Sequence, residues 1–172
     1  MKRLPILTRL SLATVLVTAT SCGGAGTEAS TPTEHLQAAM AQVKAGDSSA
    51  AVEHFDAALA ALGDDTASPL YKQALLAKVD ALAQGDPSSA SVAFAEALEA
   101  APEAFDSSDY GKVANSIADG GSFQVALDLL EAAGKQFPDA ENIDGMLVAM
   151  KARAEAEGDP AELELLRSLG YL

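Results

Sequence analysis

The chain has 172 residues, a length that suits one domain of moderate size. Only 5% of them are aromatic and tryptophan is absent, whereas alanine, the best helix former, is the most frequent residue. This composition favours closely packed helices over a β-sandwich or barrel, and no segment alternates apolar and polar residues as half-buried strands do. A formal charge of −14 opposes binding to the phosphate backbone, so we expect no nucleic-acid partner.

Residues 1–21 have the pattern of an export signal. Three basic residues precede the apolar stretch 10–19, and small residues lead to Cys22, the only cysteine of the chain. Small residues directly before a lone cysteine resemble the lipobox of bacterial lipoproteins. The resemblance implies cleavage before Cys22, a lipid on its sulfur and attachment to a membrane of the bacterial cell envelope. The alternative is an ordinary signal peptide that is cleaved elsewhere and leaves a free thiol.

The residue after Cys22 is Gly23 rather than aspartate. In a Gram-negative species this implies the outer membrane, with the protein facing the periplasm. Residues 22–31 are small and without apolar periodicity, and they are predicted to form a flexible tether. Residues 32–172 are predicted to form one helical domain. Because residues 1–21 carry three basic side chains and no acidic one, their removal changes the formal charge to −17.

Eight helices are predicted in this domain from their start and stop signals. Thr31-Pro32-Thr33-Glu34 combines a capping threonine, an early proline and a glutamate three residues after the cap. The later helices are predicted to begin at Asp47, Ser68, Asp86, Asp106 or Ser107, Ser122, Asp139 and Asp159. The first seven are predicted to end near Ala45, Leu62, Gln84, Ala101, Asp119, Gln136 and Glu157. Short connections within each pair force antiparallel neighbours.

The second helix of each pair repeats one pattern, which starts at Gly46, Gly85 and Gly121, with a weaker copy at Gly158. After each of the first three glycines, an alanine, a large apolar residue and another alanine follow at i, i+4 and i+7, which places them on one helix face. We predict that these residues pack between helices: Ala51, Phe55, Ala58, Ala90, Phe94, Ala97, Ala126, Leu130 and Ala133. A repeat of this length indicates units that bury their apolar faces only by stacking on each other.

The pattern Gly-Asp-x-x-x-Ala-x-x-x-Phe-x-x-Ala-Leu, with Pro102 and Pro138 after the second helices, resembles the tetratricopeptide (TPR) repeat over about residues 32–140. The resemblance implies an all-α superhelix of about 3–4 stacked antiparallel helix pairs that binds peptides or assembles complexes. The first helices fit the family best in the third unit, as Tyr110, Val113, Ala114 and Ile117. In the first two units their apolar residues are Leu36, Ala39, Met40 and Val43, then Leu75, Val79 and Leu82. Candidate partner contacts are Gln37, Lys44, Lys72 and Asn115.

No catalytic or metal motif accompanies this pattern. His35 and His54 are predicted to be surface residues, because neither has a histidine partner four residues away or an acidic cluster. Asp64-Asp65 lacks the alternating oxygen ligands of a calcium loop. Phosphate-binding, dinucleotide-binding and Gly-x-Ser-x-Gly patterns are absent from the sequence. We therefore predict a protein that is not an enzyme and has no cofactor.

The leading functional hypothesis is a membrane-tethered adaptor that holds a protein or peptide partner, whose identity the sequence does not give. The alternative is an envelope lipoprotein that acts as an enzyme or small-ligand binder through a pocket between helices. A third hypothesis is a structural spacer, or a subunit that self-associates through its last helices; the oligomeric state stays open. The apolar residues at this end are Leu163, Leu165, Leu166, Leu169, Tyr171 and Leu172, and they are predicted to cap the stack.

Overall fold

A computed structural model of the chain describes residues 31–157, 160–168 and 170. In this part the chain is all-helical, which confirms the predicted fold class. The helices are α1 (Pro32–Ala45), α2 (Ser48–Leu62), α3 (Pro69–Ala83), α4 (Pro87–Ala100), α5 (Ser107–Asp119), α6 (Phe123–Gln136), α7 (Glu141–Glu157) and α8 (Pro160–Ser168), with a short 3-10 helix η1 (Pro102–Ala104). The signal and Cys22, most of the tether and the fourth glycine, Gly158, lie outside the described residues.

Most helix starts follow the expected capping chemistry. Thr31 and Glu34 form a reciprocal capping box, in which the Thr31 N–H donates to Glu34 Oε2 (2.8 Å) and the Glu34 N–H donates to Thr31 Oγ1 (3.3 Å). Asp47 and Asp86 each accept a backbone N–H three residues on. Ser122 precedes α6, but its side chain makes no capping hydrogen bond.

One predicted boundary was wrong. The seventh helix begins at Glu141 rather than at Asp139, because residues after Pro138 form a turn in which the Ala140 N–H donates to the Phe137 carbonyl. The fourth helix ends at Ala100, next to the predicted Ala101, and the chain then turns through η1, which leads to the buried Phe105.

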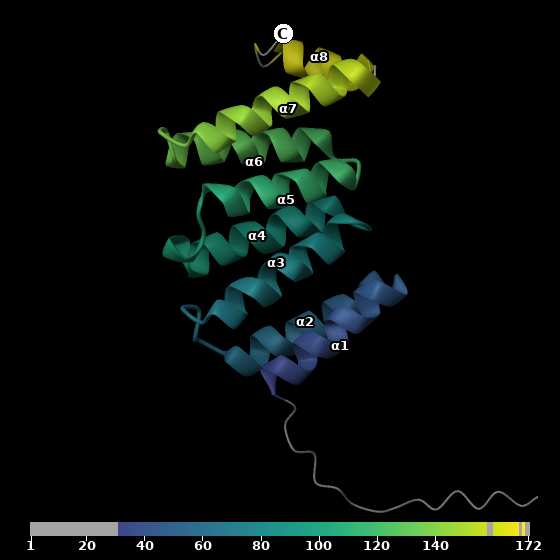
Figure 1. Ribbon diagram of the computed structural model, residues 1–172, viewed down its shortest axis with the longest axis vertical. Coiled ribbons are helices and arrows are strands. Elements are labelled where there is room, and N and C mark those ends of the chain that lie inside the picture. Colours follow the sequence, from purple (N-terminus) through teal and green to yellow (C-terminus); the bar gives the residue numbers. More distant parts are fainter. Residues whose placement is uncertain (1–30, 158–159, 169, 171–172) are drawn as a thin grey trace, which may run out of the picture.

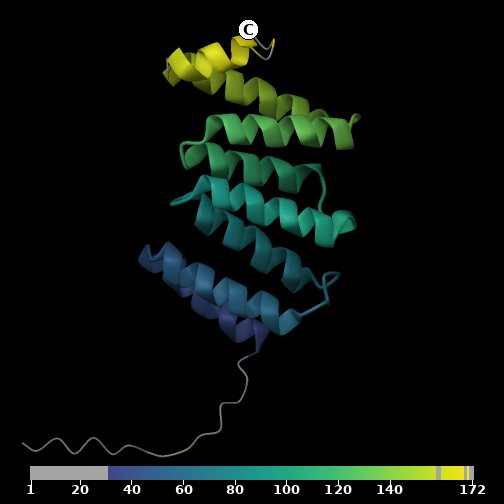
Figure 2. The same cartoon turned by 180° about the vertical axis from the view of Figure 1, so that it is seen from behind.

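The helices stack in sequence order as antiparallel pairs, so that Figures 1 and 2 show an elongated ladder from α1 to α8. Each helix packs on the next, and the first helix of each pair also contacts the first helix of the following pair: α1 with α3, α3 with α5, and α5 with α7. The second helices α4, α6 and α8 contact one another in the same way. This is the superhelix of stacked pairs that the repeat predicts.

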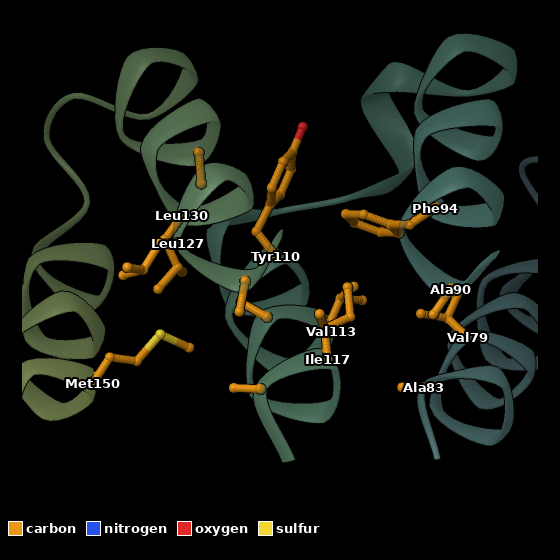
Figure 3. Packing of buried hydrophobic residues seen from close by; sticks show 14 of the residues in the cluster. Val79, Ala83, Ala90, Phe94, Tyr110, Val113, Ile117, Leu127, Leu130 and Met150 are labelled. Atoms are coloured by element: carbon orange, nitrogen blue, oxygen red, sulfur yellow. The ribbon is translucent and has the colours of Figure 1, made fainter. Parts of the chain in front are cut away.

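The nine residues of the repeated pattern are all buried: Ala51, Phe55, Ala58, Ala90, Phe94, Ala97, Ala126, Leu130 and Ala133. Figure 3 shows how the larger of them meet the first helices. Val113 and Ile117 of α5 lie between Val79 and Ala90 on one side and Leu127 and Leu130 on the other. The alanines let the backbones of neighbouring helices approach closely, and the large side chains fill the space that remains between the pairs.

The buried residues form two clusters of unequal size. The larger one extends from Leu75 to Leu166 and contains aromatic contacts of Phe94 with Phe105 and Tyr110. The smaller one joins α1 and α2 to α3 through Leu36, Ala39, Ala51, Phe55, Ala58, Ala74 and Ala81. Phe55 is its only buried aromatic residue, so the first hairpin is held to the rest mainly by alanine faces.

Gly120 allows the C-terminal ends of α3 and α5 to approach each other. A Cβ atom at this position would lie 1.9 Å from the carbonyl oxygen of Ala83 and 3.0 Å from Pro87 Cγ. We expect Gly120→Ala to destabilise the protein by about 1–3 kcal/mol, because backbone rather than a mobile side chain must move. Urea unfolding followed by circular dichroism measures this loss.

The control for Gly120→Ala is Gly85→Ala at the corresponding turn between α3 and α4, where the added Cβ meets nothing within 4 Å. Since alanine restricts the unfolded chain more than glycine does, Gly85→Ala should leave the unfolding midpoint unchanged or raise it. Equal effects of the two substitutions would contradict the packing role of Gly120.

Candidate functional site

The first helices of the pairs form one long face of the stack. The helices α1, α3, α5 and α7 contact each other in succession, so that their outward-facing residues make a continuous surface along the stack. Three hollows lie on this surface. One of about 490 Å³ lies between α1 and α3, one of about 400 Å³ between α3 and α5, and one of about 310 Å³ on α7. We call this surface the first-helix face.

Equivalent positions of successive repeats line these hollows. Gln37, Leu76 and Lys112 each lie nine residues before the glycine that starts the pattern. Met40, Val79 and Asn115 each lie six residues before that glycine and form a second row. On α7 the hollow is lined by Asp144, Leu147, Val148 and Lys151. The repeat therefore places equivalent positions at regular intervals along α1, α3 and α5, although Val79 is buried where Met40 and Asn115 are exposed.

The lining combines apolar side chains with separated charges. Met40 is 41% exposed and Val148 is 66% exposed, at opposite ends of the face. Between α3 and α5, the Ser116 hydroxyl donates to Asp80 Oδ1 at 2.6 Å, which fixes that carboxylate across the two helices. Such a surface offers apolar contact area together with a few polar groups that orient a ligand.

Three of the four candidate contacts lie on the first-helix face, in two different hollows. Gln37 and Lys44 line the hollow between α1 and α3, and Asn115 lines the hollow between α3 and α5. Met40, which the sequence placed with the apolar residues of its helix, is exposed and belongs to the same surface. Sequence reasoning missed Val148 and Lys151, and the repeat does not point to them, because the positions nine and six residues before Gly158 are Ala149 and Ala152.

Lys72 has a different environment from the other three. Its ammonium forms an ion pair with Asp109 and a longer one with Asp106, at 3.7 Å. Lys112 Nζ lies 3.3 Å from the other oxygen of Asp109. Asp109 is 1% exposed and also accepts the Asp106 N–H at 3.1 Å, as part of the capping box of α5. Lys72 therefore holds α3 against α5 through a buried carboxylate.

The charged groups of this network shift each other's pKa values. Burial alone would raise the pKa of the Asp109 carboxyl, but the hydrogen bonds from Lys72 and from the Asp106 N–H lower it below its usual value. The hydrogen bond to Asp109 raises the pKa of Lys72. Both groups stay charged over the physiological range, as an ion pair between two helices requires.

Lys72 also lines a fourth and larger hollow of about 530 Å³. This hollow lies where the connection from α2 to α3 meets the connection from α4 to α5, and not on the first-helix face. Its lining is mostly small and apolar: Thr66, Ala67, Ser68, Pro69, Ala101, Pro102 and Ala104, with Lys72 and Glu103 as its charged residues.

The described residues contain no group of three or more histidine, cysteine, aspartate or glutamate side chains that could enclose a metal ion. Among the helices of the described ranges, none combines the length and the hydropathy that a membrane span needs. Comparison with known protein families, curated proteins and solved structures gives no match for this chain. The site is therefore described by its own geometry alone.

Proposed function

We propose that this chain is a lipid-anchored, TPR-like lipoprotein of the bacterial cell envelope that binds a protein or peptide partner on its first-helix face. The observation that carries the proposal is the row of three hollows along α1, α3, α5 and α7. A segment of another protein can contact all of them at once, whereas a small molecule would fill only one. Apolar side chains exposed in such a row are typical of interaction surfaces.

The distribution of charge supports the same face. Of the eight lysine and arginine residues that follow Cys22, six lie on first helices. They are Lys44, Lys72, Lys78, Lys112, Lys151 and Arg153, of which Lys72 and Lys78 form ion pairs with Asp109 and Asp56. The acidic residues of α2, α4 and α6 are Glu53, Asp56, Glu96, Glu99, Asp128 and Glu131, whereas Lys135 is the one lysine or arginine of these three helices. In a strongly acidic protein this difference favours a partner on the first-helix face over one on the opposite face.

Site-specific photo-cross-linking in intact envelopes tests the position of the partner. A photo-reactive amino acid at Asn115, in the hollow between α3 and α5, is expected to form an adduct with a discrete partner. The matched control places the same amino acid at Glu96, an exposed position of α4. Adducts of equal yield at both positions, or none at Asn115, would contradict binding on this face.

The lipid anchor is a separate part of the proposal, and it rests on the residues before and at Cys22. We expect Cys22→Ser to give a soluble protein or an uncleaved precursor, because the serine hydroxyl does not receive the thioether-linked lipid. Fractionation of cells that express each protein measures this result. A variant that is processed and still remains in the membrane fraction like the parent would rule out the anchor.

The larger hollow beside Lys72 favours the second candidate function, small-ligand binding. Ala104→Trp places a bulky side chain at this hollow, which shares no lining residue with the hollow at the cross-linking position Asn115. If the protein works as an adaptor, the Asn115 adduct should persist in a correctly folded Ala104→Trp variant. If the Ala104→Trp variant still formed the Asn115 adduct but no longer supported the cellular role of the parent protein, that role would instead be assigned to ligand binding in this hollow.

A further inference from the structure

The two histidines of the chain, His35 and His54, lie close to each other in the structure. His35 lies in the first turn of α1 and His54 in the middle of α2. Their ring centroids are 6.1 Å apart and the ring planes are inclined by 38°. Both side chains are half-buried rather than fully exposed. The antiparallel hairpin produces this proximity, since Gly46 and Asp47 return α2 along α1.

We propose that His35 and His54 form a binding site for a late first-row transition-metal ion, with Cu(II) bound most tightly. Imidazole is a preferred ligand of copper, nickel and zinc, and the affinity of a given nitrogen site is highest for Cu(II). Metal–nitrogen bonds are about 2.0–2.1 Å long, so two imidazoles that share one ion have ring centroids about 5–6.5 Å apart. The observed 6.1 Å lies in this range.

The surroundings define what kind of site this is. Within the described residues no third histidine, cysteine, aspartate or glutamate joins the pair, so water completes the coordination. Glu34 is adjacent in sequence, but one of its oxygens accepts the Thr31 N–H in the capping box. Glu53 on α2 is exposed and contributes negative potential that attracts cations, whereas the charge of Asp56 is paired with Lys78 of α3 at 2.6 Å. The site is therefore open to solvent, suited to exchangeable rather than permanently buried metal.

Binding would also join α1 to α2, which pack closely on each other in the first hairpin. The first hairpin belongs to the smaller buried cluster, which is formed largely by alanine. A ligand that binds the folded state but not the unfolded state stabilises the folded state, and here the two donors come from different helices. The metal is thus expected to suppress local opening of α1 and α2 in particular.

The test uses the full-length chain without an affinity tag, because a polyhistidine tag would itself bind the probe. Titration with Cu(II) is expected to show one site, and pulsed EPR is expected to detect two imidazole ligands on the ion. His35→Ala and His54→Ala should each lower the affinity at least about tenfold and leave one imidazole signal. Each variant is the matched control for the other, since the sequence contains only these two histidines.

Hydrogen exchange provides a second readout that does not depend on the spectroscopy. Cu(II) should slow amide exchange in α1 and α2 of the parent protein, and it should leave exchange in these helices unchanged in either alanine variant. Unchanged affinity in the variant that lacks both histidines would overturn the proposal. A single imidazole on the ion in the parent would overturn it as well, because the metal would then not join the two helices.

Discussion

Replacement of Phe94 by alanine is expected to lower the free energy of unfolding by about 3–5 kcal/mol. The ring is fully buried and lies edge-on to Phe105 at 5.4 Å and to Tyr110 at 5.2 Å, measured between ring centroids. The substitution leaves a cavity where α4 meets η1 and α5, and these helices cannot close it without moving the whole stack. Urea unfolding followed by circular dichroism gives the change in stability.

Val92→Ala is the matched control for Phe94→Ala. Val92 lies on the same helix two residues earlier and is 57% exposed, so its truncation should change stability by no more than about 0.5 kcal/mol. Hydrogen exchange adds a spatial test, because stability in stacked repeats is distributed among units and their interfaces. If Phe94→Ala increased amide hydrogen exchange only in α1 and α2, far from the substituted ring, the packing of Phe94 against Phe105 and Tyr110 would be wrong.

Asp109→Ala is expected to cost about 2–4 kcal/mol, for two separable reasons. The substitution removes the carboxylate that neutralises Lys72 at the contact between α3 and α5. It also removes the oxygen that accepts the Asp106 N–H at the start of α5. Asp109→Asn retains an oxygen acceptor for the N–H but not the negative charge, so its cost should be intermediate. Chemical denaturation of the three proteins at neutral pH gives the two contributions.

The pH dependence follows from the directions of the two pKa shifts. The folded pKa of Asp109 lies below its unfolded value, so its stabilisation is fully present above the unfolded pKa and is lost as the pH falls through the folded pKa. The folded pKa of Lys72 lies above its unfolded value, so its stabilisation is lost as the pH rises through the folded pKa. The stability difference between parent and Asp109→Asn should therefore stay constant near neutral pH. It should narrow below about pH 4 and above about pH 10.5.

Lys112→Ala is the control for this ion-pair network. The Lys112 side chain is 65% exposed and reaches Asp109 from the solvent side, so its removal should cost no more than about 1 kcal/mol. A loss of stability as large as that of Asp109→Ala would mean that the exposed lysine, and not the pair of Lys72 with Asp109, holds the helices together.

The pH dependence has its own contradicting outcome. If the difference in unfolding free energy between the parent and Asp109→Asn increased as the pH fell, the electrostatic explanation would be wrong.

Sequence periodicity was sufficient for the arrangement of the helices because each repeat contacts mainly its neighbours. The glycine–alanine–large residue–alanine pattern specifies which face of a second helix is buried, as Ala90, Phe94 and Ala97 illustrate. Start signals such as Thr31-Pro32 with Glu34 act over a few residues, so local chemistry determines them. The start of α7 was not predicted correctly. Asp139 has the side chain of a helix cap, but it lies in the turn after Pro138 and the helix begins two residues later, at Glu141.

The candidate surface could be predicted only in part. A helix position on the first-helix face and one in the core differ by a rotation about the helix axis, which a weak apolar pattern does not fix. Met40 was therefore placed with the apolar residues of its helix although it is exposed, and Lys72 was placed with the partner contacts although it pairs with Asp109. Both outcomes depend on what the neighbouring helix presents, and that helix is more than 30 residues away in the chain.

The sequence by itself determined the helical class, the repeat, most of the helix starts and the residues that line the contacts within each pair. These features depend on local propensity and on periodicity, which are properties of short segments. Only the tertiary structure decided the row of hollows, the close approach of Gly120 to Ala83, the burial of Asp109 between two lysines and the meeting of His35 with His54. Each of these features joins side chains from different helices, and their relative position is set by how the helices pack against each other.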